Sequence, residues 1–122
     1  MIQRPLIGPV EPPDLHVMTF NIRRAMEGSL RPRRDRWSVR APAVAGLLRS
    51  ERPTVVGLQE VRPRAVDVVR ESLGPTHRLL GRGRRRDGTG EGNPLAYDDA
   101  RLELHEWGQQ ALSDRPDAPG SR

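Results

Sequence analysis

The sequence contains no cysteine and no lysine among its 122 residues. Without cysteine, the chain cannot form a disulfide, a thiolate zinc site or a thiolate nucleophile. Without lysine, it cannot supply the phosphate-binding lysine of a P-loop or the Schiff-base lysine of a pyridoxal enzyme. These absences exclude several large classes of enzyme before any motif is considered.

Apolar residues are also scarce. Hydrophobic residues make up 34% of the chain, which holds two Trp, one Tyr and one Phe. A chain of this length builds one domain, and so thin an apolar content favours a marginally stable one. No apolar run approaches the ~20 residues of a membrane span. Residues 1–14 are proline-rich and make a poor signal peptide, so we expect a disordered N-terminal extension and a cytoplasmic protein.

All 21 basic residues are arginine, and they outnumber the 16 acidic residues to give a net charge of +5. Such a balance can indicate binding to nucleic acid, because arginine neutralises phosphates and releases counterions. Arginine in place of lysine, together with abundant Ala, Gly, Pro and Val, is also typical of a GC-rich genome. We favour this second interpretation, because a charge count alone is a weak functional signal.

Two short apolar runs predict buried parallel strands. The first, residues 15–21, is apolar on both alternating faces, and we expect it to be covered on both sides. The second, residues 54–60, is β-branched and bounded by prolines. Between them, residues 22–36 predict a solvated loop, followed by a helix that begins near Arg40, because Pro42 is tolerated only in a first turn. This order predicts a βαβ unit and an α/β fold.

The remainder of the chain predicts a helix, two strands and a loop. Residues 63–73 have helical spacing, with a proline in the first turn and Gly74 as a stop signal. Residues 76–81 and 101–107 are strand candidates. Residues 81–93, rich in glycine and arginine, predict an exposed loop between them.

A polar side chain ends each of the two predicted parallel strands. Asn21 ends the first strand, and Glu60 ends the second. Ligands of α/β proteins gather at the carboxyl ends of strands, and neighbouring strands lie only ~4.8 Å apart. A carboxylate with a nearby amide oxygen is a hard-oxygen site that Mg²⁺ accepts. The pair therefore predicts metal-assisted phosphoryl chemistry, although such residues more commonly form turns or helix caps.

Five segments resemble a known family in their order and approximate spacing: "TFNIR", "W..R", "VVGLQEV", "GRGRRRDGTGEGNPLAYDDARLEL" and "LSDRPDAPGSR". Residues 15–122 resemble the N-terminal portion of the endonuclease/exonuclease/phosphatase superfamily of Mg²⁺-dependent phosphodiesterases, nucleases and phosphatases. The resemblance implies an α/β fold of α+β-like character, namely part of a four-layer α/β sandwich whose second half is missing. It also implies hydrolysis of a phosphate ester with Mg²⁺, or Mn²⁺, as the metal cofactor.

The resemblance assigns roles to particular residues. Glu60 is similar to the family's metal-binding glutamate, and Asn21 to the strand-end asparagine that orients the phosphate and the metal-bound water, so both are candidate metal-site residues. Glu91 is similar to a glutamate that orients the catalytic histidine in some members, and Gln59 is a candidate supporting hydrogen-bond donor. The implied partners are a phosphate-ester substrate, with nucleic acid among the candidates, and a complementing C-terminal half.

The family's later motifs are absent from this sequence. A "GD.N" strand end and a terminal "SDH" supply further polar ligands and the acid/base histidine with its aspartate, and neither occurs here. The chain has three histidines, none preceded by aspartate: His16, His77 and His105. His16 and His105 fall in predicted strands and are interpreted as structural or exposed. We therefore expect a truncated form with negligible hydrolytic activity by itself, because a metal ligand alone delivers no proton to the leaving group.

Two other interpretations stay open. One is a non-catalytic, arginine-rich nucleic-acid-binding protein, although the chain lacks the interleaved aromatic residues of a single-strand stacking surface. The other is the product of a truncated or frameshifted gene with no independent role. The salt dependence of nucleic-acid binding and the downstream coding sequence would separate these interpretations.

Overall fold

The computed structural model describes residues 4–28, 30–85, 88–112 and 114–115. Residues 1–3 of the expected extension, and most of the motif "LSDRPDAPGSR", lie outside the described residues. In chain order the elements are β1 (Val17–Asn21), a short 3-10 helix (Arg33–Asp35), α1 (Trp37–Glu51), β2 (Val55–Gln59), α2 (Pro63–Leu73), β3 (His77–Leu80) and β4 (Leu95–Asp98).

In the described part of the chain, the strands form one sheet in the order β1-β2-β4-β3. β1 and β2 run parallel, with Asn21 opposite Gln59, and α1 connects them. β4 pairs antiparallel with both β2 and β3. The predicted strand-helix-strand unit is confirmed, as is a strand within residues 76–81. β4 is a strand that the sequence pattern did not identify.

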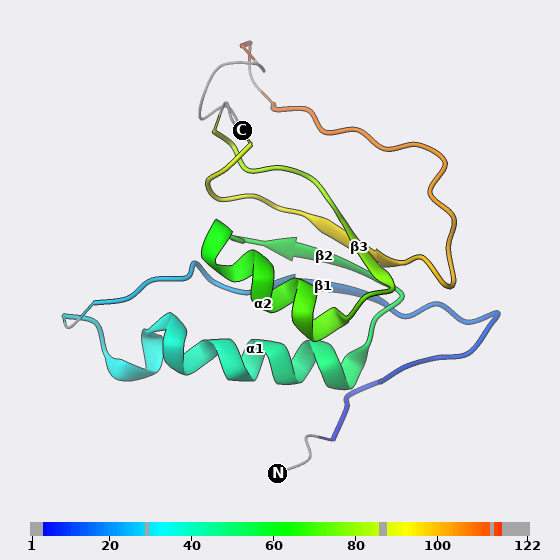
Figure 1. The fold of residues 1–122 in the computed structure, drawn as a ribbon, viewed down its shortest axis with the longest axis horizontal. Helices are drawn as coiled ribbons and strands as arrows, with labels where there is room; N and C mark the ends of the chain where they lie inside the picture. The colour runs from blue at the N-terminus through cyan, green and yellow to red at the C-terminus, as the bar shows by residue number, and fades with distance from the viewer. Residues whose placement is uncertain (1–3, 29, 86–87, 113, 116–122) are drawn as a thin grey trace.

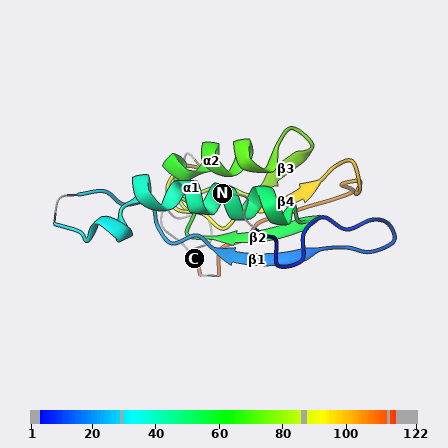
Figure 2. The same ribbon diagram turned by 90° about the horizontal axis from the view of Figure 1, so that it is seen from below.

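Both helices lie on the same face of the sheet, as Figure 1 and the turned view in Figure 2 show together. The side chains between helices and sheet are fully buried, each with an exposed fraction of 0%: Leu48, Val56, Leu58, Val69, Leu73 and Ala96. Burying one Leu or Val side chain contributes about 1.5–3 kcal/mol. This layer therefore supplies most of the apolar stabilisation of the fold.

The opposite face of the sheet has no helix over it in the described residues (Figure 2). On this open face, Val17 of β1 is 69% exposed and Leu95 of β4 is 41% exposed. The prediction that the first strand is covered on both sides is therefore wrong. β1 is an edge strand, and apolar residues on alternating faces do not reveal which face another element covers.

Helix α1 begins at Trp37, three residues before the predicted start at Arg40. Trp37 is 5% exposed, and its backbone N–H donates to the carbonyl of Met26 at 2.9 Å. Pro42 consequently lies inside the helix, beyond the first turn. The carbonyl of Ser38, which the missing N–H of Pro42 leaves without its helical donor, belongs to an exposed residue and can bond to water. Burial of Trp37 thus outweighs the helix-breaking tendency of Pro42.

Helix α2 begins at Pro63 and is followed by Gly74 at φ +92°, as the sequence predicts. Its buried face consists of Ala65, Val69, Ser72 and Leu73. Neither α2 nor any other helix in the described residues is long and apolar enough to span a bilayer.

Outside the 3-10 helix (Arg33–Asp35), the described residues 22–28 and 30–36 are irregular, but they are not a wholly solvated loop. Ile22 is 2% exposed and Ala25 is 6% exposed, so both belong to the hydrophobic core. The N–H of Ile22 donates to the carbonyl of Gln59 at 3.2 Å, which extends the pairing of β1 with β2 by one residue. The prediction of a solvated loop is therefore wrong at its start, where chain pairing pulls Ile22 inward.

Residues 101–107 do not form the predicted strand. The alternation of leucine and glutamate favours a strand, but within the described residues no neighbouring strand pairs with this segment. The segment is largely exposed. Beyond it, the side chain of Gln109 is hydrogen-bonded to the backbone of Arg82. Gln109 accepts a hydrogen bond from the N–H of Arg82 at 2.9 Å and donates one to the carbonyl of Arg82 at 3.0 Å.

Residues 4–14 contain no helix or strand but are hydrogen-bonded to the rest of the fold. The Glu51 carboxylate, in a residue 2% exposed, accepts the backbone N–H groups of Leu6, Ile7 and Gly8 at 2.8, 2.9 and 3.1 Å. Burial by itself raises the pKa of Glu51, but the hydrogen bonds from Ile7, Leu6 and Gly8 outweigh it, and the pKa lies below its ordinary value. The disorder expected for residues 1–14 stays a prediction.

Candidate active site

Asn21 and Glu60 meet at the carboxyl ends of two neighbouring parallel strands. Asn21 is the last residue of β1, and Glu60 directly follows the last residue of β2. The Nδ2 of Asn21 donates to the Oε1 of Glu60 at 3.3 Å. The parallel register that sets Asn21 opposite Gln59 thus brings the two predicted side chains into direct contact.

The turn after β1 completes the arrangement with two backbone donors. The N–H of Arg23 donates to the Oδ1 of Asn21 at 2.8 Å. The N–H of Arg24 donates to the Oε2 of Glu60 at 3.0 Å. Both side chains are therefore fixed from the same short stretch of backbone.

Two residues at this site adopt left-handed backbone conformations. Arg23 has φ +58° and Glu60 has φ +60°. Residues with a Cβ rarely adopt this region, because the side chain then lies too close to the backbone. Conformations of this kind persist where surrounding contacts hold them, and they concentrate at functional sites. The backbone strain therefore favours a functional role for the turn as a whole.

The hydrogen bonds at Glu60 also set its charge. The Asn21 side chain and, after it, the Arg24 backbone N–H hold the pKa of Glu60 below its ordinary value. Because both donors stabilise the ionised form, Glu60 is a carboxylate at neutral pH. Each of its oxygens carries one of these two bonds, which leaves further lone pairs for a ligand.

Asn93 is a site residue that the sequence reasoning did not select. Its Oδ1 accepts the backbone N–H of Glu60 at 3.3 Å. Next to it, Val61 and Gly92 exchange two backbone hydrogen bonds, at 3.0 and 2.8 Å, and so bind the two segments together. The signal was weak, because a lone asparagine in a glycine-rich loop reads as a turn residue.

Glu91 contacts two arginines. Its Oε2 lies 3.2 Å from the Nη2 of Arg84, and its Oε1 lies 3.6 Å from the Nε of Arg24. The Oε1 atom is buried and accepts no hydrogen bond in the described residues. Arg24 therefore touches both acidic groups of the site, Glu60 through its backbone and Glu91 through its side chain.

The three histidines contact other parts of the molecule. The His16 Nδ1 lies 2.9 Å from the carbonyl oxygen of Gly8, and the His77 Nε2 lies 2.8 Å from that of Pro53. His105 is exposed and lies 3.5 Å from Glu103. The structure therefore places arginines, and none of these histidines, beside Glu91.

The Gln59 side chain is hydrogen-bonded to Thr19 and Gly57. Its amide donates to the hydroxyl of Thr19 at 3.1 Å and to the carbonyl of Gly57 at 3.0 Å. Gln59 does act as a hydrogen-bond donor, but its bond to Thr19 links β1 to β2 and its bond to Gly57 lies within β2.

Glu60 and Asn21 fit a hard cation that keeps several waters better than a cation that needs a full set of protein ligands. The described residues contain no cluster of three or more His, Cys, Asp or Glu that could enclose a metal. Mg²⁺ is commonly bound by one or two carboxylates and keeps several waters, whereas zinc and calcium sites usually require more protein ligands. One ionised glutamate with further lone pairs, held by the Asn21 amide group, therefore fits Mg²⁺ or Mn²⁺.

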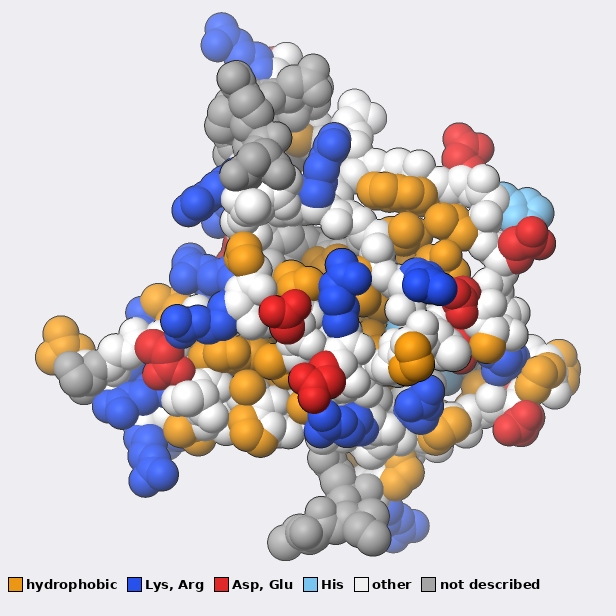
Figure 3. Space-filling view, viewed as in Figure 1, with side chains coloured by type: hydrophobic (Ala, Val, Ile, Leu, Met, Phe, Trp, Pro, Cys, Tyr) orange, Lys and Arg blue, Asp and Glu red, His pale blue; other side chains and the backbone are white. Residues whose placement is uncertain are grey.

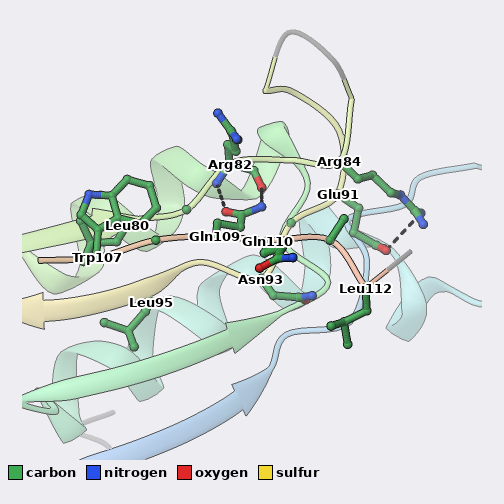
Figure 4. A pocket seen from close by; sticks show the side chains of 14 residues that line it. Leu80, Arg82, Arg84, Glu91, Asn93, Leu95, Trp107, Gln109, Gln110 and Leu112 are labelled. Atoms are coloured by element: carbon green, nitrogen blue, oxygen red, sulfur yellow. Dashed lines mark hydrogen bonds and ion pairs between the residues drawn. The ribbon is translucent and has the colours of Figure 1, made fainter. Parts of the chain in front are cut away.

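An open hollow of about 560 Å³ adjoins this site (Figure 4). Trp107 and Leu80 lie at one end of the view, and Arg84 with Glu91 lies at the other, with Asn93 between them. Trp107 is 50% exposed. The hollow thus joins an exposed apolar wall to the ion pair of Arg84 and Glu91.

The arginines do not form a single basic patch on the face seen in Figure 1. In Figure 3 the basic side chains are spread over that face and interspersed with acidic ones. Several are paired, including Arg23 with Asp35 at 2.7 Å and Arg78 with Asp99 at 2.6 Å. Clustering on one face is what a nucleic-acid-binding surface requires, and this view does not display it.

A protein-family model described as the endonuclease/exonuclease/phosphatase family matches residues 18–118. No curated protein sequence matches the chain.

Solved structures with similar folds have 28–30% sequence identity to this chain. A mannosyl-6-phosphatase from Bacteroides thetaiotaomicron has 30% identity and a TM-score of 0.72, over 88% of this chain and 40% of that one. An endonuclease/exonuclease/phosphatase from Bacteroides vulgatus has 28% identity and a TM-score of 0.72, with the same coverage. A functionally unknown conserved protein from Enterococcus faecalis has 28% identity and a TM-score of 0.73, over 87% and 40%.

This chain therefore spans about 40% of the length of these structures. The predicted fold class, an α/β fold that corresponds to part of a larger sandwich, is confirmed.

Proposed function

The chain belongs to the endonuclease/exonuclease/phosphatase family, and we propose that it supplies the cation-binding part of a phosphoester hydrolase site. The observation that carries this proposal is the Asn21–Glu60 contact of 3.3 Å at the ends of two parallel strands. When bound there, Mg²⁺ or Mn²⁺ would stabilise charge on a phosphate oxygen and lower the pKa of a water molecule.

In this proposal Glu60 binds the cation and Asn21 orients it. The Asn21 amide and the Arg24 N–H each hold one oxygen of the Glu60 carboxylate, so its direction is fixed before any ligand arrives. The Asn21 Oδ1 accepts the Arg23 N–H and has a second lone pair for the cation or its waters. Such preorganisation reduces the ordering cost of binding.

We propose a role for Glu91 beside the one that the family resemblance implies, which stays a prediction. We assign it to holding the guanidinium groups of Arg24 and Arg84, from which it lies 3.6 and 3.2 Å. Arginine presents a planar fork of donors that matches phosphate oxygens, so these two side chains are the candidates for binding the substrate phosphate. A sugar phosphate is one candidate substrate class, because a similar structure is named a mannosyl-6-phosphatase.

We extend the proposal to a complementing part of the protein that supplies the acid/base group. His16, His77 and His105 contact groups away from Asn21 and Glu60, which supports a chain that is inactive by itself. The open face of the sheet, with Val17 69% exposed, offers a surface on which that part packs. Negligible hydrolysis is therefore expected of residues 1–122 alone, and the dispersed arginines of Figure 3 give the nucleic-acid-binding alternative less support.

Binding of Mn²⁺, followed by electron paramagnetic resonance and calorimetry, tests the cation site. Glu60→Gln keeps the size of the side chain but removes its charge, so we expect affinity to fall by about tenfold or more. Asn21→Ala should weaken binding less, because it removes a hydrogen bond to Glu60 and a neutral oxygen but leaves the charge of the Glu60 carboxylate in place. The matched control is Glu71→Gln, an exposed glutamate on α2. Equal affinity in the Glu60 and Glu71 variants would contradict the assignment.

Hydrolysis of a generic phosphodiester in the presence of Mg²⁺ tests the expected inactivity. The 122-residue chain should show no turnover above background. Turnover that disappears in Glu60→Ala would mean that this chain already holds the complete machinery, and would overturn the need for a complementing part.

A further inference from the structure

Arg40 lies in the first turns of α1 and donates to several carbonyl groups at once. Its Nε donates to the carbonyl of Asp35 at 3.1 Å. Its Nη1 donates to the carbonyls of Ile22 and Arg23 at 2.9 and 3.1 Å, and its Nη2 donates to that of Arg24 at 2.6 Å. The guanidinium also lies 5.4 Å from the ring centroid of Trp37, within cation–π range.

Two of these carbonyls share peptide units with the donors of the candidate site. The carbonyl of Ile22 and the N–H of Arg23 belong to one planar peptide unit, and that N–H holds Asn21 at 2.8 Å. The carbonyl of Arg23 and the N–H of Arg24 belong to the next unit, and that N–H holds Glu60 at 3.0 Å. A trans peptide points its C=O and N–H in opposite directions. Arg40 therefore binds the carbonyl edge of both peptide units, while their N–H edges face Asn21 and Glu60.

We infer that Arg40 is a positioning residue, which aims two backbone N–H groups at Asn21 and Glu60. This inference rests on the proposed function, since it concerns the same cation site. Gripping these carbonyls fixes the orientation of both peptide planes, and with them the direction of the Glu60 carboxylate. It also explains how Arg23 is kept at φ +58°, a conformation that needs support from outside the turn.

Lysine cannot reproduce this arrangement. The planar guanidinium reaches four carbonyls in different directions, whereas an ammonium is a compact group with three donors. Arg40→Lys therefore keeps the charge and most of the aliphatic stem but loses the shared grip on residues 22–24. This difference separates positioning of the turn from a general need for positive charge.

The test combines Mn²⁺ affinity with amide hydrogen exchange in Arg40→Lys and Arg40→Gln. The matched control is Arg49→Gln, an exposed arginine on the same helix. Circular dichroism selects a temperature at which each variant is folded. If Arg40→Gln does not fold, the result for Arg40→Lys decides the test. We expect both Arg40 variants to bind Mn²⁺ about tenfold or more weakly, as supporting residues of metal sites do, and Arg49→Gln to bind as the wild type does.

Hydrogen exchange separates failure of this inference from failure of the proposed function. In both Arg40 variants, the Arg23 and Arg24 amides should exchange faster relative to the Val56 and Leu58 amides, whatever the metal affinity. If the wild type binds no Mn²⁺, the proposed function fails, and these two amides still report on the role of Arg40. Wild-type exchange at both amides in Arg40→Lys would overturn the inference, as would wild-type Mn²⁺ affinity in a protein that binds the metal.

Discussion

The layer beneath the helices and the strand-end site are adjacent, yet they are stabilised in different ways. Leu58, one residue before the end of β2, is 0% exposed and surrounded by apolar side chains. Two residues later, Glu60 is held by an amide and a backbone N–H. Within two residues at the end of β2, the chain passes from a position held by apolar burial to one held by directed hydrogen bonds.

This difference shows where stability and function can be changed separately. Apolar burial is proportional to area and has no direction, so it fixes the sheet without fixing side chains at its edge. Hydrogen bonds at a partly exposed edge add little net stability, but they set angles. Core substitutions should therefore change the free energy of unfolding, while site substitutions should change ligand affinity.

The largest expected effect on stability comes from Leu58→Ala. Removing a fully buried leucine side chain costs the lost burial plus the cavity left behind, about 2–5 kcal/mol. Urea unfolding measures the loss of stability. The Mn²⁺ affinity of the folded fraction should stay within about twofold of wild type, a change of RT ln 2 that is a small fraction of the stability lost. A tenfold loss of affinity in this variant would show that the core and the site are coupled.

Glu51→Gln is expected to have the next largest effect, because Glu51 introduces polar bonding into a buried position. The carboxylate accepts three backbone N–H groups from residues 6–8, and one amide oxygen cannot accept all three with equal geometry. Leaving buried donors unsatisfied costs about 1–3 kcal/mol. Thermal melting measures the loss, and proteolysis should cut residues 4–14 earlier in the variant. Unchanged melting and proteolysis would favour the disorder predicted for this segment.

Acid should remove the same contribution in the wild type. The three N–H donors outweigh burial and hold the pKa of Glu51 below its ordinary value of about 4.5. A carboxyl with a lowered folded-state pKa stabilises the fold above its unfolded-state pKa, and that stability is lost as pH falls through the folded-state pKa. The difference in unfolding free energy between wild type and Glu51→Gln should thus be constant near neutral pH and shrink below about pH 4.5. If the difference in unfolding free energy persists in acid, the effect of Glu51→Gln comes from the geometry of the side chain and not from the loss of its charge.

The sequence could predict the features that depend on neighbouring residues along one strand. Two apolar runs with a helix between them indicated parallel pairing, and polar residues at their ends indicated that Asn21 and Glu60 would converge. Both inferences use only local pattern and the fixed spacing of strands. The prediction for residues 101–107 was wrong because a strand also needs a partner, which alternation does not supply.

Other features depend on contacts across the fold, and no local pattern contains them. Trp37 starts α1 early because it is buried and its N–H finds the carbonyl of Met26. Arg40 reaches residues 22–24 only because the turn after β1 passes over the start of the helix. The sequence shows Trp37 and Arg40 three residues apart. Only the tertiary structure shows that the carbonyls of residues 22–24 accept hydrogen bonds from Arg40.

The smallest expected effect separates the two faces of the sheet. Val17→Thr replaces a 69% exposed side chain on an edge strand, and it should change the unfolding free energy by no more than about 0.5 kcal/mol. The matched control is Val56→Thr, which buries the same hydroxyl at a position 0% exposed and should be clearly destabilising. If a complementing part of the protein packs on the open face, Val17→Thr becomes costly once that part is present. Equal effects of Val17→Thr with and without it would mean that the complementing part binds elsewhere.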